Sequence, residues 1–251
     1  MLELFLCTDR KKNTVLALER ICRAAAEGRG GQILVTPEQF SHAAERELCL
    51  RGGNTISRFA EVLSFSRLAS RVFSIEGGAA DSETDAGGCL LMMSLAVEQV
   101  RSRLKVFGSG AVKPEFLLRL IDTLEEFRSY CVTPADLRRA GQELSGVLAV
   151  KTEEFALLME SYASVRANCG QNPETRLNRL LAALETSDFA KDKTFYFDGF
   201  TDFNGIQREI LAQLLASGAP VEVFLTCGAL NAAAQQYEAA RETARQLLSA
   251  A

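Results

Sequence analysis

Residues 33–40 read Ile-Leu-Val-Thr-Pro-Glu-Gln-Phe, and this stretch decides the fold. It opens with an apolar run that is typical of a buried strand, and a helix signal follows at once. Thr36 can cap that helix, Pro37 fits its first turn, and Gln39 stands where a capping box has Glu or Gln. A strand that leads directly into a helix predicts one repeat of an α/β protein.

Further apolar runs flank this strand and helix on both sides. They occupy residues 2–7, 194–197 and 221–225, and a shorter extended piece is expected at 55–59. The long runs are nearly continuous in their hydrophobicity rather than alternating, which is typical of strands buried on both faces. Apolar residues at helical spacing follow them. The pattern predicts a parallel sheet that is flanked by helices.

A long central block has helical periodicity and almost no strand signal. It covers residues 79–191, where Thr133-Pro134 and Asn172-Pro173 each resemble a helix cap followed by proline in the first turn. We therefore expect an α/β core made of residues 1–78 and 192–251, with a large all-helical insertion between its two parts. An alanine-rich helical pattern runs to the last residue, so we expect the intact protein to be longer.

The composition is that of an ordinary globular protein. Of 251 residues, 47% are hydrophobic and 24% are charged, and the formal net charge is -4. No apolar run approaches the roughly 20 residues that cross a bilayer, and no basic secretion signal opens the chain. We therefore expect a cytoplasmic protein without a membrane partner. The acidic balance gives no global attraction to nucleic acid, so any DNA contact requires a local groove.

Cysteine and histidine usage argues against metal and hydrolytic chemistry. The seven cysteines never form a CxxC pair, so neither a zinc site nor an iron-sulfur site is expected. His42 is the only histidine, and no GxSxG elbow supplies a nucleophile beside it. We therefore predict no catalytic residue and no metal ligand.

The loop after the first apolar run is where a nucleotide phosphate would bind in such a sheet. A phosphate-binding loop needs glycines and a lysine, but residues 7–14 read Cys-Thr-Asp-Arg-Lys-Lys-Asn-Thr. Asn13 stands in place of the lysine and Thr14 in place of the hydroxyl that binds magnesium. Asp198 ends a later strand as a metal-organising acid does, but Gly199 follows it instead of a second carboxylate. The sequence thus predicts a degenerate nucleotide site, with ATP and magnesium binding disfavoured, at Lys12, Asn13, Thr14 and Asp198.

Four segments carry a resemblance to a known family. They are residues 33–40, 43–48 (Ala-Ala-Glu-Arg-Glu-Leu), 61–69 (Glu-Val-Leu-Ser-Phe-Ser-Arg-Leu-Ala) together with Arg71, and 198–201 (Asp-Gly-Phe-Thr). In this order they resemble the N-terminal, helicase-like region of AddB, the B subunit of the bacterial ATP-dependent helicase/deoxyribonuclease AddAB, and they are similar to RexB. The central helical block is matched only by its pattern.

The resemblance implies a fold and a function. The fold would be a RecA-like, P-loop NTPase-type sheet of a superfamily 1 helicase with a helical insertion. The function would be that of a catalytically inactive domain of a helicase and exonuclease complex. Such a domain acts in double-strand break repair by homologous recombination, and it contributes to recognition of the Chi sequence. The implied partners are single-stranded DNA and an AddA-type subunit, whereas the family's nuclease site and iron-sulfur cluster lie in a C-terminal region absent here. Many relatives keep a glycine-rich loop with lysine, from which residues 7–13 depart.

The resemblance also implies which segments face DNA, namely those after the second strand and around residues 64–66. Single strands are held by stacking on aromatic side chains and by polar groups or helix N-termini at the phosphates. For the two aromatic candidates, burial in the core is the alternative interpretation. The candidate DNA-binding residues are Thr36, Gln39, Phe40, Ser64, Phe65 and Arg67.

Two other functions stay open at this point. One is an active P-loop ATPase domain with an atypical loop, which binding of labelled ATP would reveal. The other is a helical adaptor that binds a partner subunit, for which an exposed apolar patch on the helical block would be the sign. The basic residues 10–12 could contact a phosphate backbone or simply face solvent.

Overall fold

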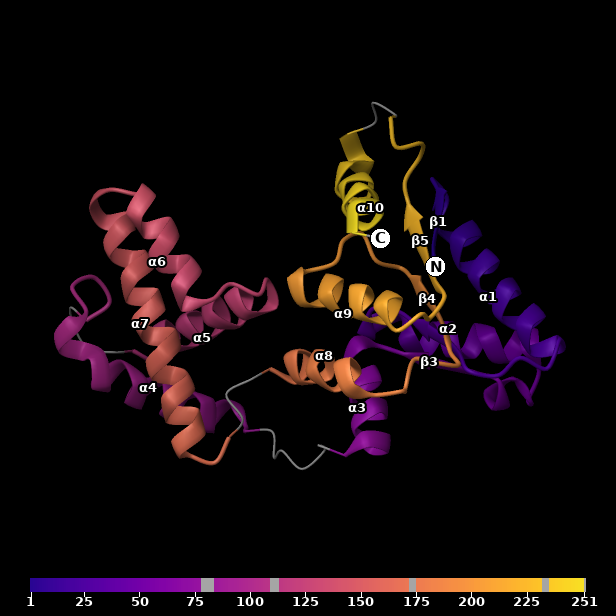
Figure 1. Cartoon of the computed structure of the whole chain (residues 1–251). Helices are drawn as coiled ribbons and strands as arrows, with labels where there is room; N and C mark the ends of the chain where they lie inside the picture. Colours follow the sequence, from indigo (N-terminus) through magenta and orange to yellow (C-terminus); the bar gives the residue numbers. More distant parts are fainter. Residues whose placement is uncertain (78–83, 109–112, 172–174, 232–234, 251) are drawn as a thin grey trace. The chain divides into compact units, whose positions relative to one another are not determined.

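The computed structural model describes residues 1–77, 84–108, 113–171, 175–231 and 235–250 (Figure 1). The chain divides into two compact units. The first comprises Met1–Ala79 and Arg176–Ala251, and the second comprises Ala80–Thr175. Each unit is described by itself below.

The sheet of the first unit has five described strands, all parallel, in the order β1-β5-β4-β2-β3. Their bounds are Leu2–Cys7 for β1, Gln32–Val35 for β2, Ala60–Leu63 for β3, Thr194–Asp198 for β4 and Val221–Thr226 for β5. The carboxyl ends of all five strands therefore lie along one edge. The predicted α/β, RecA-like fold class is confirmed.

Helices cover both faces of this sheet (Figure 1). On one face, α1 (Arg10–Ala26) and α2 (Glu38–Gly52) pack through residues such as Leu18 and Leu48. On the other face lie α3 (Phe65–Glu76), α8 (Arg176–Thr186), α9 (Gly205–Ala216) and α10 (Glu238–Ala250). Both faces of the central strands are thus mainly apolar, which explains the hydrophobic runs. The buried Glu222 of β5 is an exception, and it pairs with Arg20 of α1.

The expected extended piece at 55–59 was placed too early in the chain. The structure has a short 3-10 turn at Ile56–Arg58, and strand β3 begins only at Ala60. The half-buried Glu61, which pairs with Arg71 at 2.9 Å, interrupts the apolar pattern of this strand. A charged side chain is tolerated there because β3 is an edge strand.

The second unit contains four long helices within its described residues 84–108 and 113–171. They are α4 (Ala86–Val100), α5 (Pro114–Ser129), α6 (Pro134–Glu143) and α7 (Gly146–Asn168). A 3-10 turn at Arg101–Arg103 follows α4 directly. Thr133 caps α6 in a capping box with Asp136, as the sequence indicates, and a hydrogen bond from the Thr133 hydroxyl lowers the pKa of Asp136. The expected cap at Asn172-Pro173 falls largely on residues outside the described ranges.

Helix α8 lies in the first unit, whereas the expected boundary at residue 191 places it in the helical insertion. Its Leu180 and Leu184 are buried against α3 and α9, so α8 belongs to the first unit. An amphipathic stripe has the same helical period whichever body it packs on, and the sequence pattern therefore cannot assign it.

A buried carboxylate holds one turn of the second unit in place. Glu154 on α7 is only 2% exposed, and its carboxylate accepts three backbone hydrogen bonds. The donors are the amides of Lys105, Val106 and Phe107, at 2.5, 2.9 and 2.8 Å. A charge in this setting is stabilised by oriented N–H dipoles rather than by a cation.

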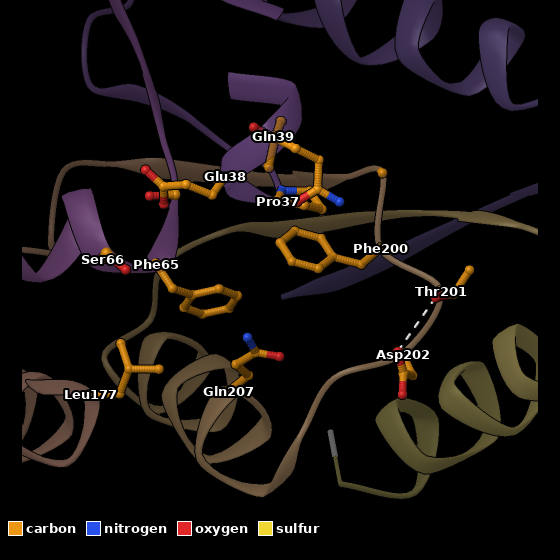
Figure 2. Close-up of a pocket in the computed structure, with 13 residues that line it drawn as sticks. Pro37, Glu38, Gln39, Phe65, Ser66, Leu177, Phe200, Thr201, Asp202 and Gln207 are labelled. Carbon is orange, nitrogen blue, oxygen red and sulfur yellow. Dashed lines mark hydrogen bonds between the residues drawn. The ribbon is translucent and has the colours of Figure 1, made fainter. Parts of the chain in front are cut away.

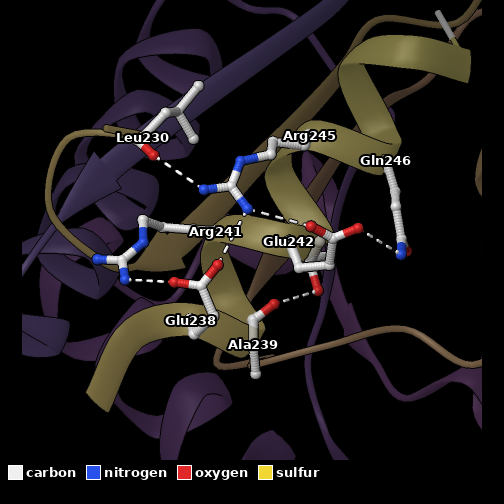
Figure 3. A network of polar contacts seen from close by, with 8 residues as sticks. Leu230, Glu238, Ala239, Arg241, Glu242, Arg245 and Gln246 are labelled. Carbon is white, nitrogen blue, oxygen red and sulfur yellow. Dashed lines mark hydrogen bonds and ion pairs between the residues drawn. The ribbon is translucent and has the colours of Figure 1, made fainter. Parts of the chain in front are cut away.

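Polar contacts anchor α10 to the segment after β5, as Figure 3 shows. Arg241 is 1% exposed and pairs with Glu238 at 2.6 Å. Arg245 binds Glu238 and Glu242, and it also donates to the carbonyl oxygen of Leu230 at 3.1 Å. The hydrogen bond from Arg241 lowers the pKa of Glu238. The hydrogen bond from Arg245 to Leu230 ties α10 to the segment after β5, whereas the other contacts lie within α10.

Candidate functional site

Two adjacent cavities lie at the carboxyl edge of the sheet. Cavity 1 has a volume of about 420 Å³ and lies beside the ends of β2, β3 and β4. Cavity 2 has a volume of about 600 Å³ and lies between α1 and α2. Thr36 and Gly199 line both, so they form the wall between the two.

Cavity 1 is built from three segments that meet because their strands are neighbours. These are the start of α2, the start of α3 and the loop from β4 into α9 (Figure 2), and Leu177 of α8 adds to their wall. In Figure 2 the rings of Phe65 and Phe200 lie close together, and Gln207 lies beside them. The residues that line the cavity are Thr36, Pro37, Glu38, Gln39, Ser64, Phe65, Ser66, Leu177, Gly199, Phe200, Thr201, Asp202 and Gln207.

The start of α2 is open, contrary to the expected cap. Pro37 occupies the N-cap position and no side chain caps the helix, so Thr36 and Gln39 do not form a capping box. Pro37 is the N-cap rather than the first helical residue, so the helix begins one residue later than predicted. The hydroxyl of Thr36 is buried and has no hydrogen-bond partner among the described residues.

The starts of α3 and α9 at cavity 1 each have a side-chain cap. Ser64 accepts a hydrogen bond from the amide of Arg67 at 3.3 Å. Asn204 and Gln207 form a reciprocal capping box at the start of α9. The start of α2 has no such cap, so its first amides can meet a ligand.

An aromatic cluster forms the base of cavity 1. Phe65 is only 5% exposed and packs against Phe197, Phe200 and Phe203, with ring centroids 5.8, 5.6 and 6.5 Å away. Phe200 is half-buried and packs on Phe203 at 4.9 Å. Phe65 is thus mainly a core residue, whereas Phe200 leaves part of its ring available.

The charged groups of cavity 1 are acidic. Glu38 and Asp202 are both exposed, and no lysine or arginine is among the described residues that line the cavity. Gln39 and Gln207 add amide groups that both donate and accept hydrogen bonds. Such a set suits the polar edges of a base, because carboxylates accept from exocyclic amino groups, and it suits a phosphate poorly.

The structure brings together four of the six candidate DNA-binding residues. Thr36, Gln39, Ser64 and Phe65 line cavity 1. Phe40 instead lines cavity 2, where the guanidinium of Arg10 lies 3.9 Å from its ring centroid. Arg67 is exposed, and it pairs at 3.9 Å with Glu45 in a separate groove beside β3.

In the segment after β1, side chains of the protein itself take the place in which a phosphate would bind. The Asp9 side chain accepts hydrogen bonds from the amides of Lys11 and Lys12 at 2.9 and 3.4 Å, so it caps α1. Asn13 is buried and donates to the carbonyl oxygen of Leu225 at 2.9 Å. Neither Lys12 nor Asn13 lines cavity 2. A helix start that already carries a carboxylate offers little attraction to a second anion.

Thr14 and Asp198 do meet at cavity 2. The Thr14 hydroxyl donates to the Asp198 carboxylate at 2.6 Å, and Asp198 is 5% exposed. Burial raises the pKa of Asp198, and the hydrogen bond from Thr14 opposes that rise. In a magnesium site these two oxygens would both face the metal, whereas here they bind each other. No group of three or more metal-binding side chains occurs within the described part of the chain.

Because burial raises its pKa, Asp198 should lower the stability of the fold at neutral pH. The protonated Asp198 side chain contributes to the free energy of unfolding most favourably below its ordinary pKa of about 3.9. That contribution is lost as pH rises through the folded-state pKa. We expect Asp198→Asn to have a higher free energy of unfolding than the parent at pH 7, with the difference vanishing toward pH 4. Urea denaturation across this pH range measures it, with the exposed Asp202→Asn as control. A less stable Asp198→Asn variant at pH 7 would contradict the prediction.

Phe200, Asp202 and Gln207 line cavity 1, although the sequence patterns did not predict them as site residues. Phe200 lies in the family-like segment at 198–201, where only the aspartate was interpreted as functional. Asn204 and Gln207 have the spacing of a capping box, so that helix start could also have been found.

The comparison with known families decides the assignment. The family model described as ADDB, N-terminal, matches residues 10–251. The chain belongs to the AddB N-terminal family. The match includes both cavities, so the open start of α2 and the glycine-free loop are features of a member of the AddB family.

Curated relatives agree with the AddB assignment. Each is named as the B subunit of an ATP-dependent helicase/deoxyribonuclease. The relative from Caldanaerobacter subterraneus is 31% identical over 215 residues, which cover 85% of this chain and 19% of the relative. Those from Pelotomaculum thermopropionicum and Moorella thermoacetica are each 33% identical, covering 77% and 84% of this chain and 17% and 19% of the relatives. The chain thus spans about a fifth of their length. Within its described residues no helix is long and apolar enough to cross a membrane.

Proposed function

We propose that this AddB domain binds single-stranded DNA at cavity 1 and contributes to recognition of the Chi sequence, without turning over nucleotide. It would do so in the cytoplasm, as part of a helicase and exonuclease complex that acts in double-strand break repair. The observation that carries the proposal is cavity 1 itself, where Phe200 and the amide and carboxylate side chains meet beside the open start of α2.

In this proposal the cavity accepts one unstacked base. The base packs against the available part of Phe200, because every base has a face that stacks on an aromatic ring. Its polar edge meets Gln39, Gln207 and the carboxylate of Glu38 or Asp202. A carboxylate only accepts hydrogen bonds, so bases that carry an amino group are favoured over thymine, whose single ring N–H lies between two carbonyl oxygens. This preference is how the site would contribute to sequence recognition.

The strand's phosphates would be held outside cavity 1. Arg10, Lys11 and Lys12 are exposed in the first turn of α1 and supply positive charge next to it. Contacts of this kind release counterions, so binding should weaken as salt rises. The net charge of -4 keeps the overall affinity modest.

The lack of turnover rests on the groups beside cavity 2. Asp9 carries the negative charge at the start of α1, Asn13 is turned to β5, and Gly199 supplies no carboxylate to orient water. Thr14 and Asp198 are bonded to each other. These contacts would have to be broken before a magnesium triphosphate could bind.

An AddA-type partner subunit is also part of the proposal. Exposed leucines on the second unit support it, because Leu91 and Leu95 are 70% and 55% exposed one helical turn apart on α4. Exposed apolar side chains that cluster on one face are typical of protein contacts.

Equilibrium binding of this chain tests the DNA part of the proposal. We expect labelled oligonucleotides rich in adenine and cytosine to bind more tightly than oligothymidine, with affinity falling between 50 and 200 mM salt by about tenfold or more. Equal binding of the two oligonucleotides, or no binding at all, would contradict it. In the same buffer ATP hydrolysis should be undetectable, and turnover that Asp198→Ala abolishes would refute the inactive site.

A further inference from the structure

Cavity 2 has the character of a small-molecule site. Its volume of about 600 Å³ lies within the range of about 300 to 1,000 Å³ that is typical of ligand pockets. Apolar side chains of both helices supply most of its wall, and a few polar groups converge on it. The apolar members are Val15, Leu18, Phe40, Ala43 and Ala44.

The charges that line cavity 2 cancel. Arg10 and Lys11 are opposed by Glu47 and Asp198 among its described lining residues. Asp198 is the most deeply buried of the four, so an incoming phosphate would approach a carboxylate. For a ligand with a net charge of either sign, attraction to one pair is therefore offset by repulsion from the other, so the cavity favours no net charge.

One wall of cavity 2 offers a flat surface. The guanidinium of Arg10 lies 3.9 Å from the centroid of the half-buried Phe40 ring, and both residues line the cavity. A planar guanidinium held on a phenyl ring is a surface on which another ring can stack.

The polar anchors of cavity 2 are Thr36 and Asp198. The buried Thr36 hydroxyl has no hydrogen-bond partner in the described structure, so rotation about its Cα–Cβ bond toward the cavity breaks no hydrogen bond. A buried hydroxyl is stabilised when it acquires a hydrogen-bond partner. Asp198 accepts from Thr14 through Oδ2, and the backbone of Gly199 also hydrogen-bonds this carboxylate. Its two oxygens carry further lone pairs that can accept from a ligand amino group.

We propose that cavity 2 binds a small, uncharged, planar heteroaromatic molecule that carries an amino group, of the aminopurine nucleoside class. The ring stacks on the surface formed by Arg10 and Phe40. Its amino group donates to Asp198, and a ring nitrogen accepts from the Thr36 hydroxyl. The same chemistry could come from a free nucleoside or from a base of a DNA strand.

Titration with 2-aminopurine riboside tests the proposal, because the chain contains no tryptophan to obscure its fluorescence. We expect saturable binding that adenosine competes away, with magnesium ATP competing at least tenfold less well. Absence of saturable binding, or tighter competition by ATP than by adenosine, would overturn the proposal. Displacement by oligodeoxyadenylate would identify the occupant as a DNA base, and its failure would identify a free nucleoside.

Two variants keep the result independent of folding. Ala43 is exposed on α2 and lines cavity 2 but not cavity 1, so Ala43→Leu should fill the cavity and weaken riboside binding more than tenfold. Thr36→Val should weaken it severalfold without lowering the thermal midpoint, because the lost hydroxyl has no partner. Ala140→Leu, at an exposed alanine of α6, is the control. Unchanged riboside binding by Ala43→Leu would place the ligand elsewhere and sink the proposal. Oligonucleotide affinity of Ala43→Leu, measured separately, reports on cavity 1.

Discussion

The Phe200→Leu variant is expected to bind single-stranded DNA about tenfold more weakly than the parent chain. Stacking of a base on an aromatic side chain contributes about 1 to 3 kcal/mol, and tenfold corresponds to about 1.4 kcal/mol. Leucine keeps most of the apolar volume that packs on Phe203, so the change removes the stacking face rather than the fold. Fluorescence anisotropy with an adenine-rich oligonucleotide measures the effect.

A matched control separates stacking from general surface effects. Tyr130 in the second unit is 49% exposed and lies outside cavity 1, so Tyr130→Leu should leave DNA affinity unchanged. The thermal midpoints of both variants show whether either change disturbs folding. If Phe200→Leu binds as tightly as the parent, the base does not stack on this ring and cavity 1 is not the DNA site.

Glu154→Ala is expected to lower the free energy of unfolding of the second unit by about 3 kcal/mol or more. The substitution removes the carboxylate that accepts from the amides of Lys105, Val106 and Phe107, and a buried donor that loses its acceptor costs about 1 to 3 kcal/mol. Water that enters the vacated space limits the total. Because the chain lacks tryptophan, urea denaturation is best followed by far-ultraviolet circular dichroism.

The neighbouring glutamate provides the control. The Glu153 side chain is 48% exposed and pairs with Arg138, which keeps a second carboxylate partner in Glu160. Glu153→Ala should therefore cost less than about 1 kcal/mol. Glu154→Gln should fall between the two, since an amide oxygen still accepts while its NH₂ group opposes an amide donor. Equal losses for the Glu153→Ala and Glu154→Ala variants would refute the role given to the Glu154 carboxylate.

The sequence predicts the sheet well because its signals are local. Continuous apolar runs mark β1, β2, β4 and β5, and the Pro37 segment marks the start of α2 to within a residue. The third strand is short, lies at an edge and contains Glu61, so its pattern is too weak to place it. The expected boundary at residue 191 places α8 with the insertion, whereas α8 lies in the first unit, because periodicity does not say what a helix packs against.

The candidate DNA site is predictable where it depends on topology. Thr36 and Ser64 directly follow β2 and β3, which are neighbouring parallel strands, so their proximity follows from the strand order. The directions of Phe40 and Arg67 do not follow from spacing alone, because each depends on how its helix is rotated against the sheet. The open start of α2 was missed since Thr36 has the composition of a cap without its geometry.

The carboxylate of Asp9 at the start of α1 would oppose any attempt to engineer nucleotide binding into this domain. Lysine at position 13 would replace a buried amide that is bonded to Leu225, and glycines added nearby would leave the resident anion where it is. Reactivation would therefore need several coordinated changes rather than one reversion. Under the proposed function, the affinity of the domain for single-stranded DNA does not depend on the cellular ratio of ATP to ADP. The timing of DNA binding and release must then come from another, nucleotide-driven polypeptide.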